Sequence, residues 1–213
     1  MKIVAVTDIH GRTNYPKETA SALQKADIIL IAGDITNFGN CDDAEHVLER
    51  LASSNKRILA VPGNCDRLGV NKTLTAKNMN LHGVSISIGS VALYGVGGCS
   101  KTPFHTPQEY SEKKISQILN SLAVPKEAQT HILVSHAPPH NTKLDKVLIG
   151  FHVGSKAVRK FIEDSQPDLV VCGHIHEARG ADRIGKTLII NPGPFPKHYG
   201  VINVDGVINY ELR

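Results

Sequence analysis

The sequence predicts a mixed α/β fold of two packed sheets with helices outside them, and three observations lead to this prediction. Short apolar runs alternate with helical segments over residues 1–65, which is typical of a parallel sheet with right-handed crossovers. Later apolar runs are separated by short turns and predict antiparallel hairpins. The chain has 213 residues and no repeat or linker that would mark a boundary, so we expect a single domain over 1–213.

Three buried strands and two helices are expected in the N-terminal part. In chain order they are a strand at 3–7, a helix at 16–25, a strand at 27–32, a helix at 42–53 and a strand at 57–61. Asp42 or Asp43 can cap the second helix, and Val47, Leu48 and Leu51 recur along it at helical spacing. The alternation of strand and helix predicts that these three strands run parallel.

The rest of the chain combines hairpins with two further helices. Strands at 84–88 and 91–96 flank Gly89-Ser90 and are expected to form a hairpin. The next elements are a helix at 107–122, a strand at 130–135, a helix at 154–164, a strand at 168–172, and final strands at 181–184, 187–191, 199–204 and 207–212. Gly185-Lys186 and Asp205-Gly206 supply turns between the final strands.

Composition and charge narrow the classes of function. Lys and Arg number 24 against 20 Asp and Glu, and a net charge of +4 is too small to indicate a nucleic-acid or membrane partner. The first apolar run is too short for a signal peptide, and no later run approaches the roughly 18 residues of a membrane span. The four cysteines lack the C-x-x-C spacing and are expected to be free thiols in a reducing compartment, so we expect a cytoplasmic protein. The 11 histidines, beside no tryptophan, direct attention to metal binding.

Typical metal ligands follow five of the predicted strands. Because the carboxyl ends of parallel strands lie along one edge of an open α/β sheet, these residues are expected to meet in one crevice. Their seven donors are too many for one tetrahedral ion and suit two ions with five or six ligands each. Mixed nitrogen and oxygen donors suit manganese, iron or zinc better than magnesium or calcium. The candidate metal ligands are Asp8, His10, Asp34, Asn64, His136, His174 and His176.

The spacing of these residues supports a shared crevice. In an extended segment, alternate side chains point to the same side, so Asp8 with His10 and His174 with His176 can each face one site. A glycine precedes Asp34, Asn64 and His174. We expect it to let the backbone turn sharply and to leave room for metal or phosphate.

The sequence resembles the calcineurin-like metallophosphoesterase superfamily over about residues 8–176. The resemblance is carried by five ordered motifs, which are Asp8-x-His10, Gly33-Asp34, Gly63-Asn64-Cys65-Asp66, His136 and Gly173-His174-x-His176. It implies a four-layer sandwich of two mixed β-sheets flanked by helices. It also implies a phosphate-ester substrate.

The resemblance assigns the ligands to two metal ions. It implies one ion held by Asp8, His10 and His176, a second held by Asn64, His136 and His174, and Asp34 as the bridge between them. The ions would be divalent or trivalent transition metals such as manganese, iron, zinc or nickel. Two such ions lower the pKa of a bridging water and stabilise the attacking and leaving oxygens of a displacement at phosphorus. We therefore expect hydrolysis of phosphodiesters or phosphomonoesters by a hydroxide that bridges the metals.

One residue departs from the superfamily pattern. The usual block is G-N-H-D or G-N-H-E, whose histidine donates a proton or clamps the phosphate, and Cys65 occupies that place here. We expect Cys65 to fill space, with a thiol acid as the alternative. His152 is the candidate substitute acid, with an ordinary loop or helix-cap histidine as the alternative. Asp66 is a further catalytic candidate. We expect it to orient the neighbouring ligands rather than to bind metal itself.

Other candidate roles and functions follow from the same motifs. Arg12, Asn37 and Arg179 lie within a few residues of the metal motifs and could bind phosphate oxygens. Without the usual histidine, we expect diesters or esters with good leaving groups to be preferred. The alternatives are a small nuclease and a non-catalytic scaffold that binds a protein, as a retromer subunit of similar fold does. Complete ligands favour the enzyme over the scaffold, and the modest charge disfavours nucleic acid.

Overall fold

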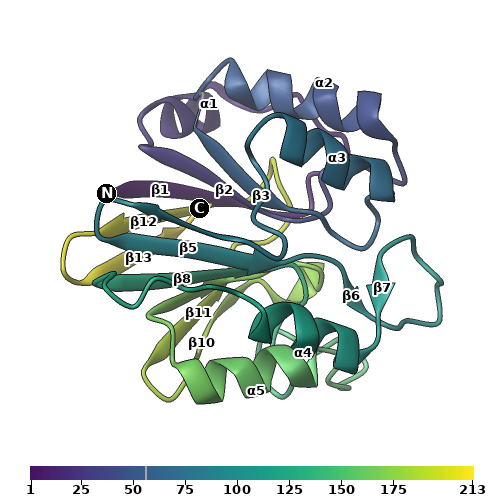
Figure 1. Ribbon diagram of the computed structural model, residues 1–213. Coiled ribbons are helices and arrows are strands. Elements are labelled where there is room, and N and C mark those ends of the chain that lie inside the picture. The colour runs from purple at the N-terminus through teal and green to yellow at the C-terminus, as the bar shows by residue number, and fades with distance from the viewer. Residues whose placement is uncertain (56) are drawn as a thin grey trace.

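Two mixed β-sheets lie face to face in the computed structural model, which describes residues 1–55 and 57–213 (Figure 1). The first sheet has the strand order β13-β12-β1-β2-β3, in which β1, β2 and β3 are parallel and the other pairs are antiparallel. Its strands are β1 (Lys2–Val6), β2 (Ile28–Ala32), β3 (Ile58–Val61), β12 (Gly200–Val204) and β13 (Ile208–Leu212). The N-terminal strand therefore pairs with a C-terminal one.

The second sheet has the order β10-β11-β9-β8-β5-β4. Its four central strands are parallel, and an antiparallel strand closes each edge. Its strands are β4 (Ser85–Ile88), β5 (Val91–Val96), β8 (Thr130–Ser135), β9 (Leu169–Val171), β10 (Gly180–Ile184) and β11 (Thr187–Asn191). A short parallel pair, β6 (Cys99–Ser100) and β7 (Glu109–Tyr110), extends from the carboxyl end of β5 (Figure 1).

Helices cover the outer face of each sheet, which gives four layers (Figure 1). The helices α1 (Lys17–Gln24), α2 (Cys41–Ala52) and α3 (Leu68–Ala76) cover the first sheet, and α4 (Glu112–Asn120) and α5 (Lys156–Ser165) cover the second. Alternate side chains of each strand point to opposite faces. Ile3 of β1 therefore packs between the two sheets, whereas Val4 packs under the helices. None of the described helices is long and apolar enough to cross a membrane.

The sandwich of two mixed sheets flanked by helices confirms the predicted fold class. Three helices differ from the expectation, and in α2 the side chain of Asn40, rather than Asp42 or Asp43, caps the N-terminus. The helix α3 was not expected from the sequence. The helix expected at 107–122 begins only at Glu112, because Ser111 caps it and residues 109–110 form β7. A single turn of 3-10 helix, η1 (His176–Ala178), also follows the loop after β9.

The parallel strands of both sheets place their carboxyl ends close together. Nδ1 of His136, just after β8, lies 2.8 Å from the carbonyl oxygen of Ala32 at the end of β2. The backbone N–H of Gly98 donates to the carbonyl of Pro62, which joins the segments after β5 and β3. Loops from the two sheets therefore form one edge, where the candidate ligands lie.

Candidate metal centre

The seven predicted ligands come from strands of both sheets. Asp8 and His10 follow β1, and Asp34 and Asn64 follow β2 and β3 in the first sheet. The others follow the second sheet, with His136 after β8 and His174 and His176 after β9. Five chain segments that are far apart in sequence therefore bring imidazole, carboxylate and amide groups to one edge.

Donor atoms of five of these residues, together with Cys65, form three overlapping groups, and within each group all atoms lie within 4.8 Å of one another. The groups are Asp8 with His10 and His176, His10 with Asp34 and Cys65, and Asp8 with Asp34 and His136. Every two groups share one residue. The donors therefore make one continuous cluster that could hold metal.

Asp34 occupies the middle of the cluster. One of its carboxylate oxygens, Oδ2, lies 3.7 Å from Nε2 of His10, and the other, Oδ1, lies 3.5 Å from Nε2 of His136. The same Nε2 of His10 lies 3.4 Å from Nε2 of His176, and this His176 nitrogen lies 3.4 Å from Oδ1 of Asp8. The two oxygens of one carboxylate thus face imidazoles on opposite sides, as a bridging ligand requires.

Asn64 and His174 border the other side of His136. The Asn64 amide oxygen lies 2.8 Å from Nε2 of His136, and the rings of His136 and His174 are 5.1 Å apart at their centroids. The amide nitrogen of Asn64 donates to the hydroxyl of Thr106 at 3.1 Å. This contact turns the amide oxygen toward the histidines.

Four of the seven candidate ligands have left-handed backbone conformations, which non-glycine residues seldom adopt. Their φ angles are 53° at Asp8, 48° at His10, 51° at Asp34 and 71° at His174. Neighbouring loops hold this backbone in place, since His10 N–H donates to the carbonyl of Asp34 and His174 N–H donates to the Asp8 carboxylate. Strain of this kind is stored where a site needs particular side-chain directions.

The glycines before three of the ligands serve close packing of other ligands. A Cβ on Gly33 would clash with the His136 ring, one on Gly63 would clash with Asp34, and one on Gly173 would clash with Thr7. Only Gly33 has a positive φ, of 91°. Close contact with neighbouring side chains, and not a left-handed backbone, therefore explains the glycines at 63 and 173. In this structure, the space they leave is filled by neighbouring side chains.

The buried Asp66 carboxylate joins two of the ligand loops. It accepts hydrogen bonds from the backbone N–H groups of Ile35, Thr36 and Gly63 and from the Thr36 hydroxyl, at 2.7–3.1 Å. Ile35 follows Asp34 and Gly63 precedes Asn64, so the carboxylate fixes these two ligands relative to each other. All these bonds go to the protein itself, which agrees with an orienting role rather than a direct catalytic one.

Burial favours the neutral imidazole, the form that ligates metal, at two of the candidate ligands, His10 and His174. Burial lowers the pKa of His10, and burial together with the charge on His136 lowers the pKa of His174 to about 3. Burial raises the pKa of Asp34 to about 6, and the neighbouring charges of Asp8 and Asp66 add to that rise. Metal binding requires deprotonated ligands, so these histidines need to release few protons.

The donor set fits transition-metal ions. Nδ1 of His10 is buried and has no hydrogen-bond partner among the described residues. The carboxylates of Asp8 and Asp34 are both buried in one cluster, and buried charges are normally paired or coordinate a metal. Cations among these groups would offset the repulsion between the two carboxylates. Mixed imidazole and oxygen donors suit manganese, iron or zinc.

A known protein family matches most of this chain. The calcineurin-like phosphoesterase family profile matches residues 1–178. The chain belongs to this family. It is 42% identical over 201 residues to an uncharacterized protein of Methanocaldococcus jannaschii, a match that covers 91% of this chain and 88% of the relative.

Solved structures share the fold of this calcineurin-like phosphoesterase. One superposes with a TM-score of 0.81 at 19% identity, over 100% of this chain and 98% of the other. A purple acid phosphatase from yellow lupin (Lupinus luteus) seeds gives a TM-score of 0.61 at 11% identity, over 100% of this chain and 51% of that one. At such identities the likeness concerns the fold alone.

Cys65 lies against the cluster in this member of the family. Its backbone N–H donates to Oδ1 of Asp34 at 2.8 Å, and its thiol belongs to the group formed with His10 and Asp34. Burial, with the nearby Asp34 charge, raises the pKa of the thiol far above its ordinary value. A thiol with so high a pKa is a poor proton donor, which favours the space-filling interpretation.

His152 does not join the ligand cluster. Its Nδ1 lies 2.7 Å from Oδ1 of Asp145, and its ring lies 6.0 Å from that of His140. Asp145 is buried and also accepts from the N–H groups of residues 141, 142 and 154, so it holds the imidazole firmly. The general-acid role of His152 therefore stays a prediction.

The predicted phosphate-binding residues lie around the edge with exposed side chains. Arg12 and Asn37 follow the β1 and β2 ligands. Arg179 donates through Nε to the carbonyl of Pro192 at 3.1 Å, so part of its guanidinium supports the 191–194 turn. Direct contact of these three residues with substrate stays a prediction.

Two positioning residues have no counterpart in the sequence analysis. Thr106 orients Asn64 from a loop 42 residues away, and no motif marks it. Asn191 is buried and donates to the carbonyl of Ile175, between two candidate histidine ligands. The Asn-Pro-Gly-Pro sequence beginning at Asn191 is typical of a rigid turn, but its link to the metal loop depends on the tertiary structure.

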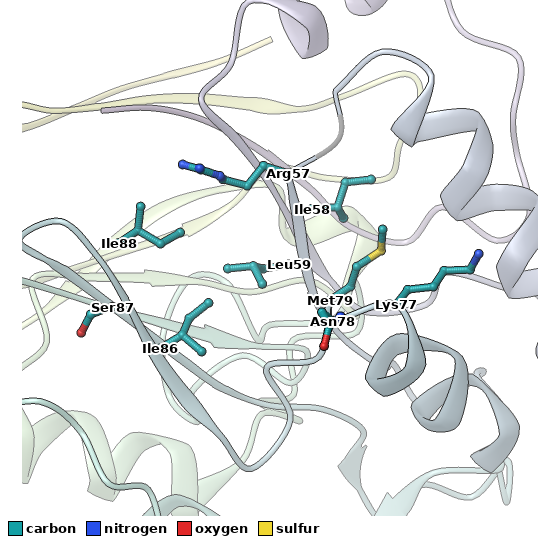
Figure 2. Close-up of a pocket in the computed structure, with 9 residues that line it drawn as sticks. All are labelled: Arg57, Ile58, Leu59, Lys77, Asn78, Met79, Ile86, Ser87 and Ile88. Carbon is teal, nitrogen blue, oxygen red and sulfur yellow. The ribbon is translucent and has the colours of Figure 1, made fainter.

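A cavity of about 610 Å³ lies outside the metal centre (Figure 2). It opens between the edge strands β3 and β4, and Figure 2 shows Leu59, Ile86 and Ile88 lining it. Its β3 residues lie at the start of that strand, whereas Asn64 follows the strand's carboxyl end. The candidate ligands therefore belong to a different part of the surface.

Proposed function

We propose that this chain is a metal-dependent phosphoesterase that uses two transition-metal ions. The observation that carries the proposal is the cluster of three donor groups. Any two of these groups have one residue in common, and the common residues are Asp8, His10 and Asp34. Such a cluster can hold two neighbouring ions with a common carboxylate. Family membership supports this reaction class, and the donor cluster supports locating the reaction at this edge of the sheets.

The ligands are proposed to divide as the motifs imply. Asp8, His10 and His176 would hold one ion, Asn64, His136 and His174 the other, and Asp34 would contact both. When bound, such a pair supplies Lewis-acid catalysis and a nucleophile at neutral pH for displacement at phosphorus. Burial keeps the imidazoles of His10 and His174 neutral, so both can offer a lone pair at neutral pH.

Protonation of the leaving oxygen is assigned to a group other than Cys65. Nδ1 of His152 lies 2.7 Å from Oδ1 of the buried Asp145, which holds the ring and leaves Nε2 as the nitrogen proposed to serve the substrate. His152 directly precedes Val153, which lines a cavity beside Asn64 and His174. We assign His152 as the general acid for esters whose leaving oxygen needs a proton.

The substrate preference follows from the missing histidine. A phosphodiester carries less negative charge than a monoester dianion, and an acidic leaving group departs without protonation. We therefore expect manganese-loaded protein to hydrolyse bis(p-nitrophenyl) phosphate with a higher kcat/KM than p-nitrophenyl phosphate. Since both release the same phenol, the ratio reports the type of ester.

The proposal is tested by metal-dependent hydrolysis. Protein stripped with a chelator should not hydrolyse either ester, and manganese should restore turnover in wild type but not in Asp34→Asn. Circular dichroism of both proteins serves as the folding control. If the loaded wild type bound metal but hydrolysed neither ester, the chain would be better described as a non-catalytic scaffold of this fold.

A further inference from the structure

An apolar cavity adjoins the candidate metal centre. It has a volume of about 270 Å³, and two of its lining residues are the candidate ligands Asn64 and His174. Pro103 and Phe104 supply one wall, from the loop between β6 and β7. The other lining residues are Lys101, Thr102, Val147, Val153 and Ile175, so none is acidic.

The first wall is fixed to the metal centre. Glu109 accepts from the N–H and hydroxyl groups of both Thr102 and Thr106 at 2.6–3.0 Å, and the Thr102 hydroxyl accepts from Phe104 N–H. Thr106 in turn accepts from the amide of Asn64. One hydrogen-bond network therefore sets the position of Phe104 relative to a candidate ligand.

The second wall is a tight chain reversal. Val147 N–H donates to the carbonyl of Phe151, and Val153 N–H donates to the carbonyl of Asp145. Leu148 N–H contacts the carboxylate of Glu177, beside His176, at 3.4 Å. This segment is thus paired along its length and rests near the histidine loop.

The apolar walls are open to solvent. Phe104 is 80% exposed and Val153 41% exposed. Exposed apolar side chains that gather at a concave site mark a ligand or partner surface. Two candidate metal ligands, Asn64 and His174, line this cavity. A group attached to a phosphorus atom bound at the metal centre would therefore extend directly into the cavity.

We infer that this cavity binds the apolar, aromatic part of the ester, most directly the alcohol released on hydrolysis. The inference rests on the proposed phosphoesterase function. Ligand sites run from about 300 Å³ upward, so a cavity of about 270 Å³ suits a group of one or two rings. The Phe104 ring provides an aromatic surface against which such a group can stack.

Binding of non-hydrolysable phosphonates gives the first test. Calorimetry on manganese-loaded protein should show phenylphosphonate binding about 10- to 30-fold more tightly than methylphosphonate, the gain expected from burying much of one ring. Phe104→Ala should reduce this ratio about threefold or more and leave methylphosphonate binding unchanged. Phe151→Ala is the matched control, since Phe151 is 67% exposed in the opposite segment and does not line the cavity.

A second measurement separates this inference from the proposed function. In metal-free protein, phenol at millimolar concentration should shift the methyl NMR signals of Val153 and Ile175, and Phe104→Ala should weaken the shifts. Phenol shifts without any ester hydrolysis would support the cavity and contradict the function. Hydrolysis with a phenyl-to-methyl ratio near one and no phenol shifts would overturn the cavity. A change of oligomeric state in Phe104→Ala, with the ratio unchanged, would also overturn it, because the wall would then cover a second copy of the chain.

Discussion

Replacing Asp66 should loosen the metal centre without touching a ligand. Its carboxylate oxygens accept in pairs, with Oδ1 facing the N–H and hydroxyl of Thr36 and Oδ2 facing the N–H groups of Ile35 and Gly63. Asparagine keeps one accepting oxygen. The asparagine oxygen can accept from the N–H groups of Ile35 and Gly63, and its amide nitrogen then faces Thr36. The Thr36 hydroxyl can rotate to accept from this nitrogen. The Thr36 N–H is a donor, so it loses its acceptor.

The magnitude follows from the bonds lost. A hydrogen bond to a charged group contributes about 1.5–3 kcal/mol, and a buried donor left unpaired costs about 1–3 kcal/mol. Burial raises the pKa of Asp66, which means that the buried charge is itself unfavourable. Removing this charge therefore offsets part of the stability lost with the hydrogen bonds. We expect Asp66→Asn to lower the free energy of unfolding by about 1–3 kcal/mol. Asp66→Ala leaves three buried N–H groups without an acceptor and should cost about 4 kcal/mol or more.

Urea unfolding of metal-free protein measures this free energy, and calorimetry with manganese measures the effect on the site. Asp66→Asn should bind manganese more weakly than wild type at a temperature where both are folded. Asp164→Asn is the control, because Asp164 is an exposed helical carboxylate paired with Lys160. Equal stability and equal manganese affinity in Asp66→Asn and wild type would refute the positioning role.

Three further predictions concern the surroundings of the metal centre. Cys65→Ala should keep two ions and change the rate by less than about tenfold, as measured by elemental analysis and steady-state kinetics; loss of an ion would make the thiol a ligand instead. His152→Gln should slow hydrolysis of phenyl esters about 100-fold and of nitrophenyl esters far less, and equal effects on both would exclude it as the general acid. Glu109→Gln tests a pH effect: partial burial opposes ionisation of Glu109, but hydrogen bonds from Thr102 and Thr106 lower its pKa to about 2. Its contribution to stability is present above its unfolded pKa of about 4.5 and is lost as pH falls toward 2, so the difference in urea midpoint between variant and wild type should shrink over that range; a constant difference would contradict this.

The sandwich could be predicted because its central strands are short, continuous runs of apolar residues in the sequence. β2 reads Ile-Ile-Leu-Ile-Ala and is buried throughout, as expected for a parallel strand covered on both faces. Polar residues placed directly after such strands then locate the site edge. These two signals act locally, so they can be read without knowledge of the tertiary structure.

The missed elements depend on tertiary contacts. The helix α3 contains Gly69 and the β-branched Thr73 and Thr75, which are weak helix formers. Its buried residues Val70 and Leu74, spaced four apart, pack in the cluster beneath α2. Packing rather than propensity therefore decides this helix.

The same limit applies to the site. Asp34 could be found from its motif, but the way its two oxygens face His10 and His136 depends on how the sheets pack. Thr106 and the apolar cavity arise from a loop without a recognisable pattern. Sequence thus locates the ligands, and the fold adds their orientation and their neighbours.

The number of metal ions bound per chain decides whether the centre is binuclear. Purified protein, stripped and then saturated with manganese, should bind two ions per chain by calorimetry and elemental analysis. Asp34→Asn should lose one or both, because the shared carboxylate offsets the charge of the pair. A wild-type protein with every ligand intact that bound at most one ion under saturation would contradict the binuclear centre.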